Sequence, residues 1–480
     1  MSAQANLLPS TKRILRPLGH FENVLAAMHE CKNTTVAFTS WINSKLFLSD
    51  DVWKTSLQLL QKNIPHLRLN IEWQDGKRYF KYMEDPYVDI EILDVTSDND
   101  WKTVHEDMMR VQFLREDSPL WRVNILRMSK SRDVTYKVDS SSYASNGYPT
   151  VVVFAIHHSI LDGTSYILML KQLIRYLNAV SKNDPIENDE VVTFHPNTES
   201  LLPQDKMAFR WTDYYQVIKE RIRSLFPYHS PYLQRFPPPP NSGKGYTKTV
   251  ALVFTISETE RIIAKCKEHQ TTVHGALVAA ASIALVNAIN EGATPRPVDV
   301  PTSHAVNMRR FLPPEFQNAF GLFIGLTYIT VSVPAVATYQ SFWGLAKRSK
   351  QTLHASFHNG DMIQGCKIRG HLLPDDNSVK GLLASDKCKY DMATSNIGDC
   401  DKHCPPGEAD DNVHATRIVT STAMQNVPKL FYHYLHKFRG RFCYNLDYGT
   451  NWVCEVNAIK HAEMTVKLMK MAAGEEKYWK

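Results

Sequence analysis

The amino-acid sequence predicts an α/β protein of two comparable lobes. Segments with strand and helix patterns alternate along residues 1–184, and the alternation begins again after residue 247. Residues 185–246 lie between them and include the four consecutive prolines Pro237 to Pro240, which favour an extended linker because proline cannot enter a helix or a central strand. The expected organisation is therefore a first lobe at 1–184, a crossover linker at 185–246 and a second lobe at 247–480.

Hydrophobic periodicity assigns the elements of the first lobe. In order, they are a helix at 51–64, strands at 66–73 and 78–83 around a Gln-Asp-Gly turn, a strand at 120–128, an exposed loop at 129–150, a strand at 151–156 and a helix at 164–180. The strand at 151–156 is a continuous apolar run, which suits burial on both faces. Apolar residues at helical spacing make the helix that follows it amphipathic.

The same patterns assign the linker and the second lobe. In order, we expect a helix around 209–225, a strand at 248–256, a helix opening at 257–260, a helix at 272–289, strands at 323–333 and 441–446, and a final helix at 458–471. Ser257 and Glu260 have capping-box spacing, so we expect them to begin their helix. Strands and helices thus alternate in a similar way in the two lobes, although no internal sequence repeat is visible.

Composition excludes several classes of protein. With 480 residues and 43% hydrophobic content, the chain can bury a core without disulfides or metals. The net charge of +6 is spread along the chain without basic runs, so no nucleic-acid partner is expected. The N-terminus lacks the apolar region of a signal peptide, and the longest apolar run, at 273–289, is too polar for a membrane span. Eight scattered cysteines favour reduced thiols in the cytoplasm.

One cysteine cluster raises the question of a metal site. Cys400, His403 and Cys404 lie close together, with Cys388 upstream. Their spacing matches no common zinc signature, so an ordinary loop is expected and no metal is assigned.

The chemistry is expected directly after the buried strand at 151–156. There the chain reads His157-His158-Ser-Ile-Leu-Asp162-Gly163 before the next helix. Reactive groups of α/β folds gather where a strand ends and a helix begins, and histidine can accept and return a proton near neutral pH. Asp162 could fix the loop or pair with a cation of the other lobe. A lone histidine here is most often a satisfied core residue, but the combination favours a functional site.

These residues resemble the signature H-H-x-x-x-D-G of an acyltransferase superfamily. That superfamily includes alcohol O-acetyltransferases, plant acyl-CoA acyltransferases, peptide-synthetase condensation domains and chloramphenicol acetyltransferase. Further landmarks of the family follow in the expected order: Leu15-Arg16-Pro17-Leu18-Gly19 with Glu22, Pro119-Leu120-Trp121-Arg122, Val306-Asn307-Met308-Arg309, Gly321-Leu-Phe323-Ile-Gly325 and Ser395-Asn396-Ile397-Gly398. The plant motif D-F-G-W-G is matched poorly by Leu446-Asp447-Tyr448-Gly449. The resemblance is therefore to the alcohol-acetyltransferase and condensation-like branch.

The resemblance implies a fold and roles for individual residues. It implies two chloramphenicol-acetyltransferase-like lobes, each a mixed sheet flanked by helices, with an active-site tunnel at their interface. His158 would be the general base, and Asp162 would be structural, paired with Arg309 or with the adjacent Arg310. His157 would hold the loop through hydrogen bonds. Weaker substrate or cofactor contacts fall on Gly321, Gly325, Ser395 and Asn396, for which turn or packing roles are the alternative.

The function implied is a stand-alone, cytoplasmic, monomeric O-acyltransferase. Its donor would be acyl-coenzyme A, with acetyl-CoA as the expected co-substrate and no tightly bound cofactor, and its acceptor a small alcohol that becomes an ester. No carrier-protein motif G-x-D-S-L occurs in the chain. One alternative is an N-acyltransferase or condensation-like enzyme that uses a carrier-bound thioester. Another is a relative that binds a ligand without turnover, although such a relative need not keep His158, Asp162 and Gly163.

Overall fold

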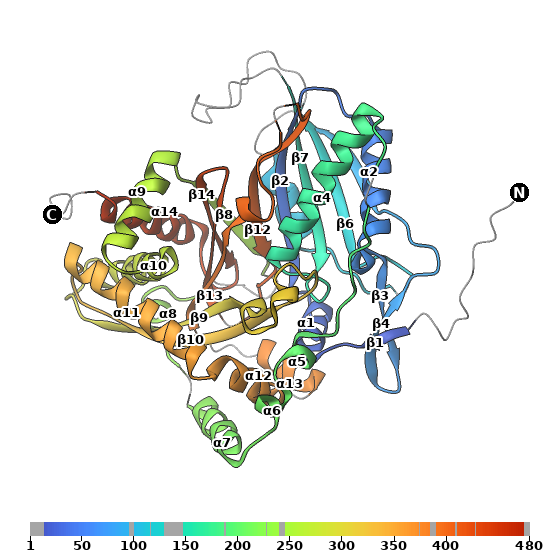
Figure 1. The fold of residues 1–480 in the computed structure, drawn as a ribbon. Coiled ribbons are helices and arrows are strands. Elements are labelled where there is room, and N and C mark those ends of the chain that lie inside the picture. Colours follow the sequence, from blue (N-terminus) through green and yellow to red (C-terminus); the bar gives the residue numbers. More distant parts are fainter. Residues whose placement is uncertain are drawn as a thin grey trace, which may run out of the picture.

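The protein is built from two lobes that each carry a β-sheet flanked by helices (Figure 1). The computed structural model describes residues 14–95, 100–115, 117–128, 147–186, 189–226, 228–239, 245–373, 375–384, 390–408, 410–427 and 429–474. Both sheets contain parallel and antiparallel pairs. The predicted α/β class and its two lobes are confirmed.

The sheet of the first lobe has five strands in the order β12-β2-β7-β6-β5. Their bounds are β2 Thr35–Ser44, β5 Ile90–Val95, β6 Trp121–Met128, β7 Tyr148–His157 and β12 Val413–Thr422. Helices α2 (Asp50–Asn63) and α4 (Gly163–Lys182) pack together over one face, and α3 (Asp100–Met108) covers the other. β7 lies in the middle of the sheet, so its apolar run from Val151 to Ile156 is buried from both sides.

A smaller sheet and helix α1 complete this lobe. The strands β1 (Ile14–Pro17), β4 (Lys77–Tyr82) and β3 (Leu69–Gln74) form it in that order. The predicted strand at 66–73 starts late, because Pro65–Arg68 forms a 3-10 turn whose Pro65 stands at its N-terminus. Most of the predicted loop at 129–150 lies outside the described residues, and its last three residues belong to β7.

The sheet of the second lobe has six strands in the order β10-β9-β11-β13-β14-β8. Their bounds are β8 Thr247–Val253, β9 Val298–Asn307, β10 Ile324–Val333, β11 Tyr390–Asp399, β13 Lys429–Phe438 and β14 Arg441–Gly449. One face carries α9 (Ile256–Glu268), α10 (Val273–Asn290), α11 (Tyr339–His358) and α14 (Glu455–Ala472), which share a single hydrophobic core with the strands. By length and composition α10 alone among the described helices could cross a membrane, but 72% of it is buried in this core.

The crossover and the long connection before β11 contribute shorter helices. They are α5 Thr198–Leu201, α6 Gln204–Met207, α7 Trp211–Leu225, α8 Pro231–Arg235, α12 Asp361–Leu372 and α13 Asp376–Leu383. The linker between 185 and 246 is therefore partly helical, and Pro231 begins α8 because proline suits the first turn of a helix.

Two further features differ from the sequence prediction. The capping box of α9 is formed by Thr255 and Glu258, not by Ser257 and Glu260, so the helix begins two residues earlier. The second difference concerns β12, which lies within residues 247–480 yet pairs with β2 of the first lobe. A single cut at residue 247 therefore does not separate the lobes.

The lobes are consequently joined by backbone pairing as well as by side chains. The carboxyl group of Asp447 on β14 accepts hydrogen bonds from Ser421 Oγ at 2.8 Å and from the Thr422 backbone N–H at 3.1 Å, both on β12. Burial raises the pKa of Asp447 to about 7, although the hydrogen bonds it accepts act against that rise.

Candidate active site

The motif loop connects the central strand of the first lobe to a long helix. β7 ends at His157, and α4 begins at Gly163 after the N-cap residue Asp162. Asp162 Oδ1 accepts a hydrogen bond from the Ser165 backbone N–H at 2.9 Å, which satisfies one of the free donors at the helix start. The sequence therefore turns sharply at the strand end, where we expected the chemistry.

The position of His158 fixes which of its ring nitrogens is basic. Its Nδ1 lies 3.0 Å from the carbonyl oxygen of Leu161, and because a carbonyl only accepts, Nδ1 carries the proton. Nε2 is then the nitrogen with the lone pair. Burial lowers the pKa of His158, although the Leu161 carbonyl and the Asp162 charge oppose the effect. The ring is therefore neutral and able to accept a proton near pH 7.

His157 points into the core of the first lobe. Its Nδ1 accepts from the Ser159 hydroxyl at 2.7 Å and from the Ser159 backbone N–H at 3.2 Å, and its ring centroid lies 4.3 Å from that of His29. Burial lowers the pKa of His157 well below its ordinary value. These contacts hold the turn after β7 and occupy a nitrogen that would otherwise be basic.

The structure brings Asp162 and Arg309 together across the lobes. Arg309 Nη1 donates to Asp162 Oδ2 at 2.7 Å and Nη2 to Oδ1 at 3.2 Å, and both side chains are almost fully buried. The Phe323 backbone N–H also donates to Oδ2, at 2.9 Å. Burial by itself would raise the pKa of Asp162, but the Arg309 charge and these donors hold it below its ordinary value. The carboxylate is occupied by four donors and does not contact the His158 ring nitrogens.

Ser165, which was not singled out from the sequence, joins Asp162 and Arg309 in one hydrogen-bonded clamp between the lobes. Its hydroxyl donates to the Gly321 carbonyl at 2.8 Å and accepts from Arg309 Nη2 at 2.9 Å and from the Gly321 N–H at 3.0 Å. Arg309 also donates to the carbonyl of Ala319. The three-residue spacing from Asp162, typical of a capping position, is the signal that could have identified Ser165.

Gly321 and Gly325 have different structural reasons to be glycine. Gly321 has φ of +141°, in the region that favours glycine, and its carbonyl also accepts from the Asp162 backbone N–H at 3.2 Å. Gly325 lies within β10, where a Cβ would come within 2.5 Å of Met308 Sδ. Gly321 thus belongs to the clamp, whereas Gly325 allows close packing.

Gly163 lets the second lobe approach the motif. A Cβ at this position would lie 2.8 Å from Ile397 Cδ1 and 3.0 Å from Cγ1. Ile397 belongs to β11, next to Ser395 and Asn396, which are only half-buried although β11 is a central strand. Asn396 Oδ1 accepts from the Gly398 N–H at 2.8 Å and so supports the local bend. His158 and Gly163 are also half-buried, so the motif meets β11 at a place that solvent can reach.

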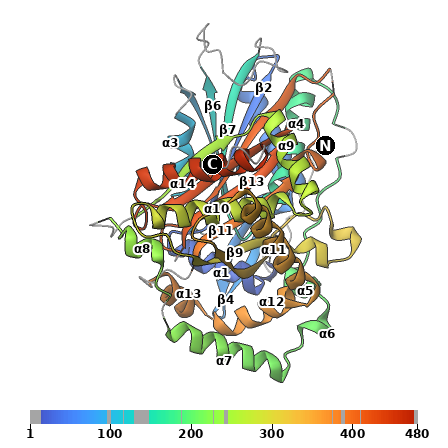
Figure 2. The same ribbon diagram turned by 90° about the vertical axis from the view of Figure 1, so that its left-hand side faces the viewer.

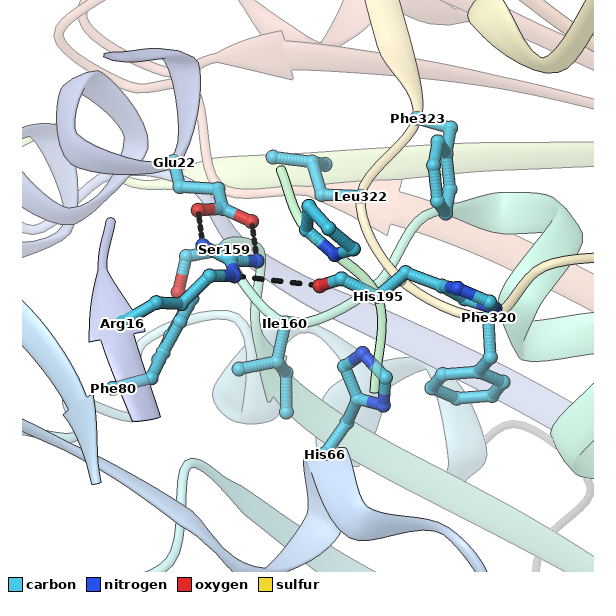
Figure 3. Close-up of a pocket in the computed structure, with 12 residues that line it drawn as sticks. Arg16, Glu22, His66, Phe80, Ser159, Ile160, His195, Phe320, Leu322 and Phe323 are labelled. Carbon is cyan, nitrogen blue, oxygen red and sulfur yellow. Dashed lines mark hydrogen bonds and ion pairs between the residues drawn. The ribbon is translucent and has the colours of Figure 1, made fainter. Parts of the chain in front are cut away.

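A small polar pocket lies next to the motif loop, whose residues Ser159 and Ile160 form part of its wall (Figure 3). Arg16 donates two hydrogen bonds to Glu22, at 2.6 and 2.8 Å, and both side chains line the pocket. Arg16 also donates to the carbonyl of His195 at 3.3 Å. The enclosed volume is about 10 Å³, enough for one water molecule, so this pocket is a structural support and not a substrate site.

The cysteine cluster forms a packed loop in the described part of the chain. Cys400 and Cys404 are buried, and Arg439 Nη1 donates to the Cys404 carbonyl and to Asp401, both at 2.8 Å. Cys388 lies outside the described residues. Among the described residues, no group of three or more His, Cys, Asp or Glu side chains is placed to hold a metal ion.

Comparison with known proteins places this site in a family. A model of the condensation domain matches residues 33–365. The chain belongs to the condensation-domain family. Its similarity to the nonribosomal peptide synthetase kk1B of Curvularia clavata is 23% identity over 311 residues, which are 64% of this chain and 2% of that protein. The chain therefore spans a very small part of this curated relative.

Two solved structures share the fold over nearly the whole chain. TRI3 trichothecene 15-O-acetyltransferase from Fusarium sporotrichioides has a TM-score of 0.69 at 14% identity, covering 99% of this chain and 100% of that chain. Polyketide synthase associated protein 5 from Mycobacterium tuberculosis has a TM-score of 0.65 at 16% identity, covering 96% and 99%. The predicted superfamily is confirmed, and the family supports an acyl-transferring enzyme.

Proposed function

We propose that this condensation-family protein is an O-acyltransferase that moves an acyl group from coenzyme A to an alcohol, with His158 as general base. The observation that carries the proposal is the hydrogen bond from His158 Nδ1 to the Leu161 carbonyl, which makes Nε2 the basic nitrogen of a neutral ring. Ring orientation and protonation state are the two properties that a general base requires.

The proposed reaction is a direct transfer. Nε2 of His158 takes the proton of the acceptor hydroxyl while the oxygen attacks the thioester carbonyl. The carbon–sulfur bond then breaks, and the protonated His158 returns the proton to the leaving thiolate. The products are an ester and a thiol. A thioester is already activated, so positioning and a base are sufficient, and no covalent nucleophile or tightly bound cofactor is proposed.

Asp162 and Arg309 act as positioning residues in this mechanism. Their ion pair connects the start of α4 to the 3-10 turn Met308–Phe311 of the second lobe. Both groups are saturated by protein partners, so neither is assigned a proton transfer. We place the substrates in a tunnel where the motif meets β11, with Ser395 and Asn396 as candidate contacts.

Three observations support coenzyme A as the donor and an alcohol as the acceptor. The fold match to TRI3, whose name describes a 15-O-acetyltransferase, covers both chains almost completely. The chain contains no G-x-D-S-L motif, and its net charge of +6 suits a polyanionic nucleotide. Scattered cysteines, of which the seven described ones form no disulfide, support a cytoplasmic location, and we propose a monomer.

A carrier-bound thioester is the second candidate donor. The condensation-domain match and the similarity to a nonribosomal peptide synthetase favour it directly. In that case the same base would serve a carrier-linked substrate, and the acceptor could be an amine, so that the product would be an amide.

A donor-by-acceptor screen with thiol release as the readout separates the two candidates. Acetyl-coenzyme A, the truncated N-acetylcysteamine thioester and an acyl-loaded carrier protein are offered with alcohols and amines. We expect acetyl-coenzyme A to react best, because the truncated donor loses remote binding energy. A rise in ionic strength should raise the donor KM more than that of a neutral acceptor, because salt screens charges beyond about 10 Å at 0.1 M. Preference for the loaded carrier protein would establish the condensation-like candidate instead.

The His158→Ala variant tests the assigned base. Turnover should fall by about 10²–10⁴ fold while the fold is retained, because the base is lost and the loop backbone stays in place. His157→Ala is the matched control, and it should lower thermal stability more than it lowers the rate of the folded enzyme. Unchanged turnover in folded His158→Ala protein would remove this residue from the mechanism.

A further inference from the structure

Helix α7 packs against the protein with its polar side. Asp213 is buried and accepts from Lys367 Nζ at 2.7 Å and from Gln364 Nε2 at 3.1 Å, both on α12. Val217 is the one other fully buried residue among the described side chains of α7. An ordinary surface helix buries its apolar side, so the orientation of α7 is reversed.

The apolar side of α7 faces outward. Six large apolar residues in and just after the helix are between 51% and 80% exposed: Trp211, Tyr214, Tyr215, Ile218, Ile222 and Phe226. At 3.6 residues per turn, Trp211, Ile218 and Ile222 fall within about 40° of arc, so they form one continuous row. Figure 2 shows α7 at the periphery of the molecule, below the other labelled helices. Contiguous exposed apolar surface of this kind marks an interaction site.

Cationic side chains border this row on both sides. Lys219 and Arg221 are exposed and lie about 80° from Trp211 in opposite directions around the helix. Arg210 and Lys206 are exposed just before the helix begins. Arg221 also donates to the His371 carbonyl at 3.3 Å, which holds its guanidinium at the edge of the row. The acidic residues of the helix, Asp213 and Glu220, lie on the side that faces the protein.

We propose that α7 docks the protein on an anionic membrane surface, lying in the plane of the interface. Apolar and aromatic residues on one face, with lysine and arginine at both borders, are the pattern of an interfacial helix. The apolar row would enter the headgroup boundary while Lys219 and Arg221 reach the lipid phosphates. Charge complementarity selects this partner, because the borders of the row are basic and the helix carries its acidic groups on the opposite side. The inference is independent of the proposed acyl transfer.

Vesicle co-sedimentation of the full chain tests the proposal. The vesicles consist of phosphatidylcholine, with or without phosphatidylserine, and contain no substrate. Ile218→Ser with Ile222→Ser should lower the partition coefficient by at least about thirtyfold, because two partly inserted apolar side chains are lost. Val336→Ser with Val456→Ser is the matched control, since both valines are more than 60% exposed elsewhere on the surface. The control should bind as the wild type does.

The cationic border has its own variant pair. Lys219→Gln with Arg221→Gln should weaken binding to the phosphatidylserine vesicles by about twentyfold and leave the phosphatidylcholine binding little changed. Arg261→Gln with Lys267→Gln on α9 removes the same charge from another surface and should have less effect. Added salt should weaken binding of the wild type to the anionic vesicles.

Three outcomes would overturn the proposal. The first is that the wild type fails to sediment with either vesicle. The second is that the Ile218 and Ile222 variant binds as the wild type does. The third is concentration-dependent dimerisation in analytical ultracentrifugation that this variant abolishes, which would make a second copy the occupant of the row. Thermal unfolding of every variant should match the wild type, because the substituted side chains are exposed.

Discussion

At the scale of single residues, the site depends on which atoms are already occupied. Leu161 fixes His158 through a backbone carbonyl, which no sequence motif encodes, because any residue supplies that group. Asp162 is saturated by Arg309, Ser165 and Phe323 and leaves no acceptor for the substrate. The two residues therefore have different roles: His158 can accept a proton, whereas the Asp162 carboxylate only holds the two lobes together.

The pH dependence of turnover should reflect the burial of His158. Burial lowers the pKa of His158, and a base is active only while it is unprotonated. Activity should therefore persist as the pH falls through 6.5, the ordinary histidine value, and decline only below it. The measurement is kcat/KM against pH for the free enzyme, with circular dichroism to exclude unfolding. An acid limb centred at or above pH 6.5 would contradict the assigned environment.

The Asp162→Asn variant should lose both stability and activity. Removing one partner of a buried ion pair strands the other charge and costs about 3–5 kcal/mol. Asp107→Asn is the control, because its pair with Arg110 is exposed and should contribute little. In denaturant unfolding, combining Asp162→Asn with Arg309→Met should cost less than the sum of the single changes. Additive effects would show that the pair does not couple the lobes.

At the scale of elements, a strand or helix was predictable where its apolar residues follow one unbroken pattern. An element whose residues contact two sheets, or whose start has two possible caps, was not. The apolar run of β7 and the periodicity of α2, α4 and α10 placed these elements within a few residues. The start of α9 was misplaced because two overlapping pairs, Thr255 with Glu258 and Ser257 with Glu260, have the same capping spacing. β12 was missed, since its polar and apolar residues serve two sheets and show neither simple alternation nor a continuous apolar run.

Close contact between elements can be tested at Gly163. Gly163→Ala should destabilise the protein by about 1–3 kcal/mol, because the new methyl group would meet Ile397 at 2.8 Å. Ile397→Val removes the nearest atom and should restore part of the stability of the alanine variant. Gly381→Ala in α13 is the control, as a Cβ there meets nothing within 4 Å, and it should be neutral or stabilising. Thermal unfolding of the four proteins measures the effect, and a tolerated Gly163→Ala would disprove the tight approach.

At the scale of the whole molecule, the strand β12 makes the lobes interdependent. The sequence predicted the number of lobes and the order of the family landmarks, because both depend on local patterns. It did not predict that residues 413–422 cross to the first sheet, since strand pairing over some 370 residues of separation leaves no local signal. Arg309 could be named only through the family resemblance, and its other partners, Ala319 and Ser165, became visible in the structure.

This shared core should make the protein sensitive to acid. Burial lowers the pKa of eight buried histidines. The pKa falls to about 3 or 4 in five of them, namely His29, His66, His105, His436 and His461. It falls well below the ordinary value in the other three, His157, His304 and His433. Below pH 6.5 these rings are protonated in the unfolded chain but not in the folded chain, so the free energy of unfolding decreases as the pH decreases. Burial raises the pKa of four buried carboxyl groups, which bind protons more readily in the folded state and oppose the loss: Glu22, Glu106, Asp391 and Asp447.

The balance between these histidines and carboxyl groups determines how steeply the free energy of unfolding should depend on pH. The eight histidines outnumber the four opposing carboxyl groups, so the unfolded chain should bind more protons than the folded chain between pH 6.5 and 5. Each proton taken up on unfolding lowers the stability by about 1.4 kcal/mol per pH unit, so a few protons amount to a large part of the stability of a typical protein. We therefore expect stability to decrease steadily as the pH falls from 6.5 to 5, and unfolding to occur in one transition because β12 joins the lobes. Unfolding followed by circular dichroism at several pH values measures the slope, and His105→Gln should reduce it by about one proton. A pH-independent stability between 6.5 and 5 would mean that these rings reach solvent in the folded protein.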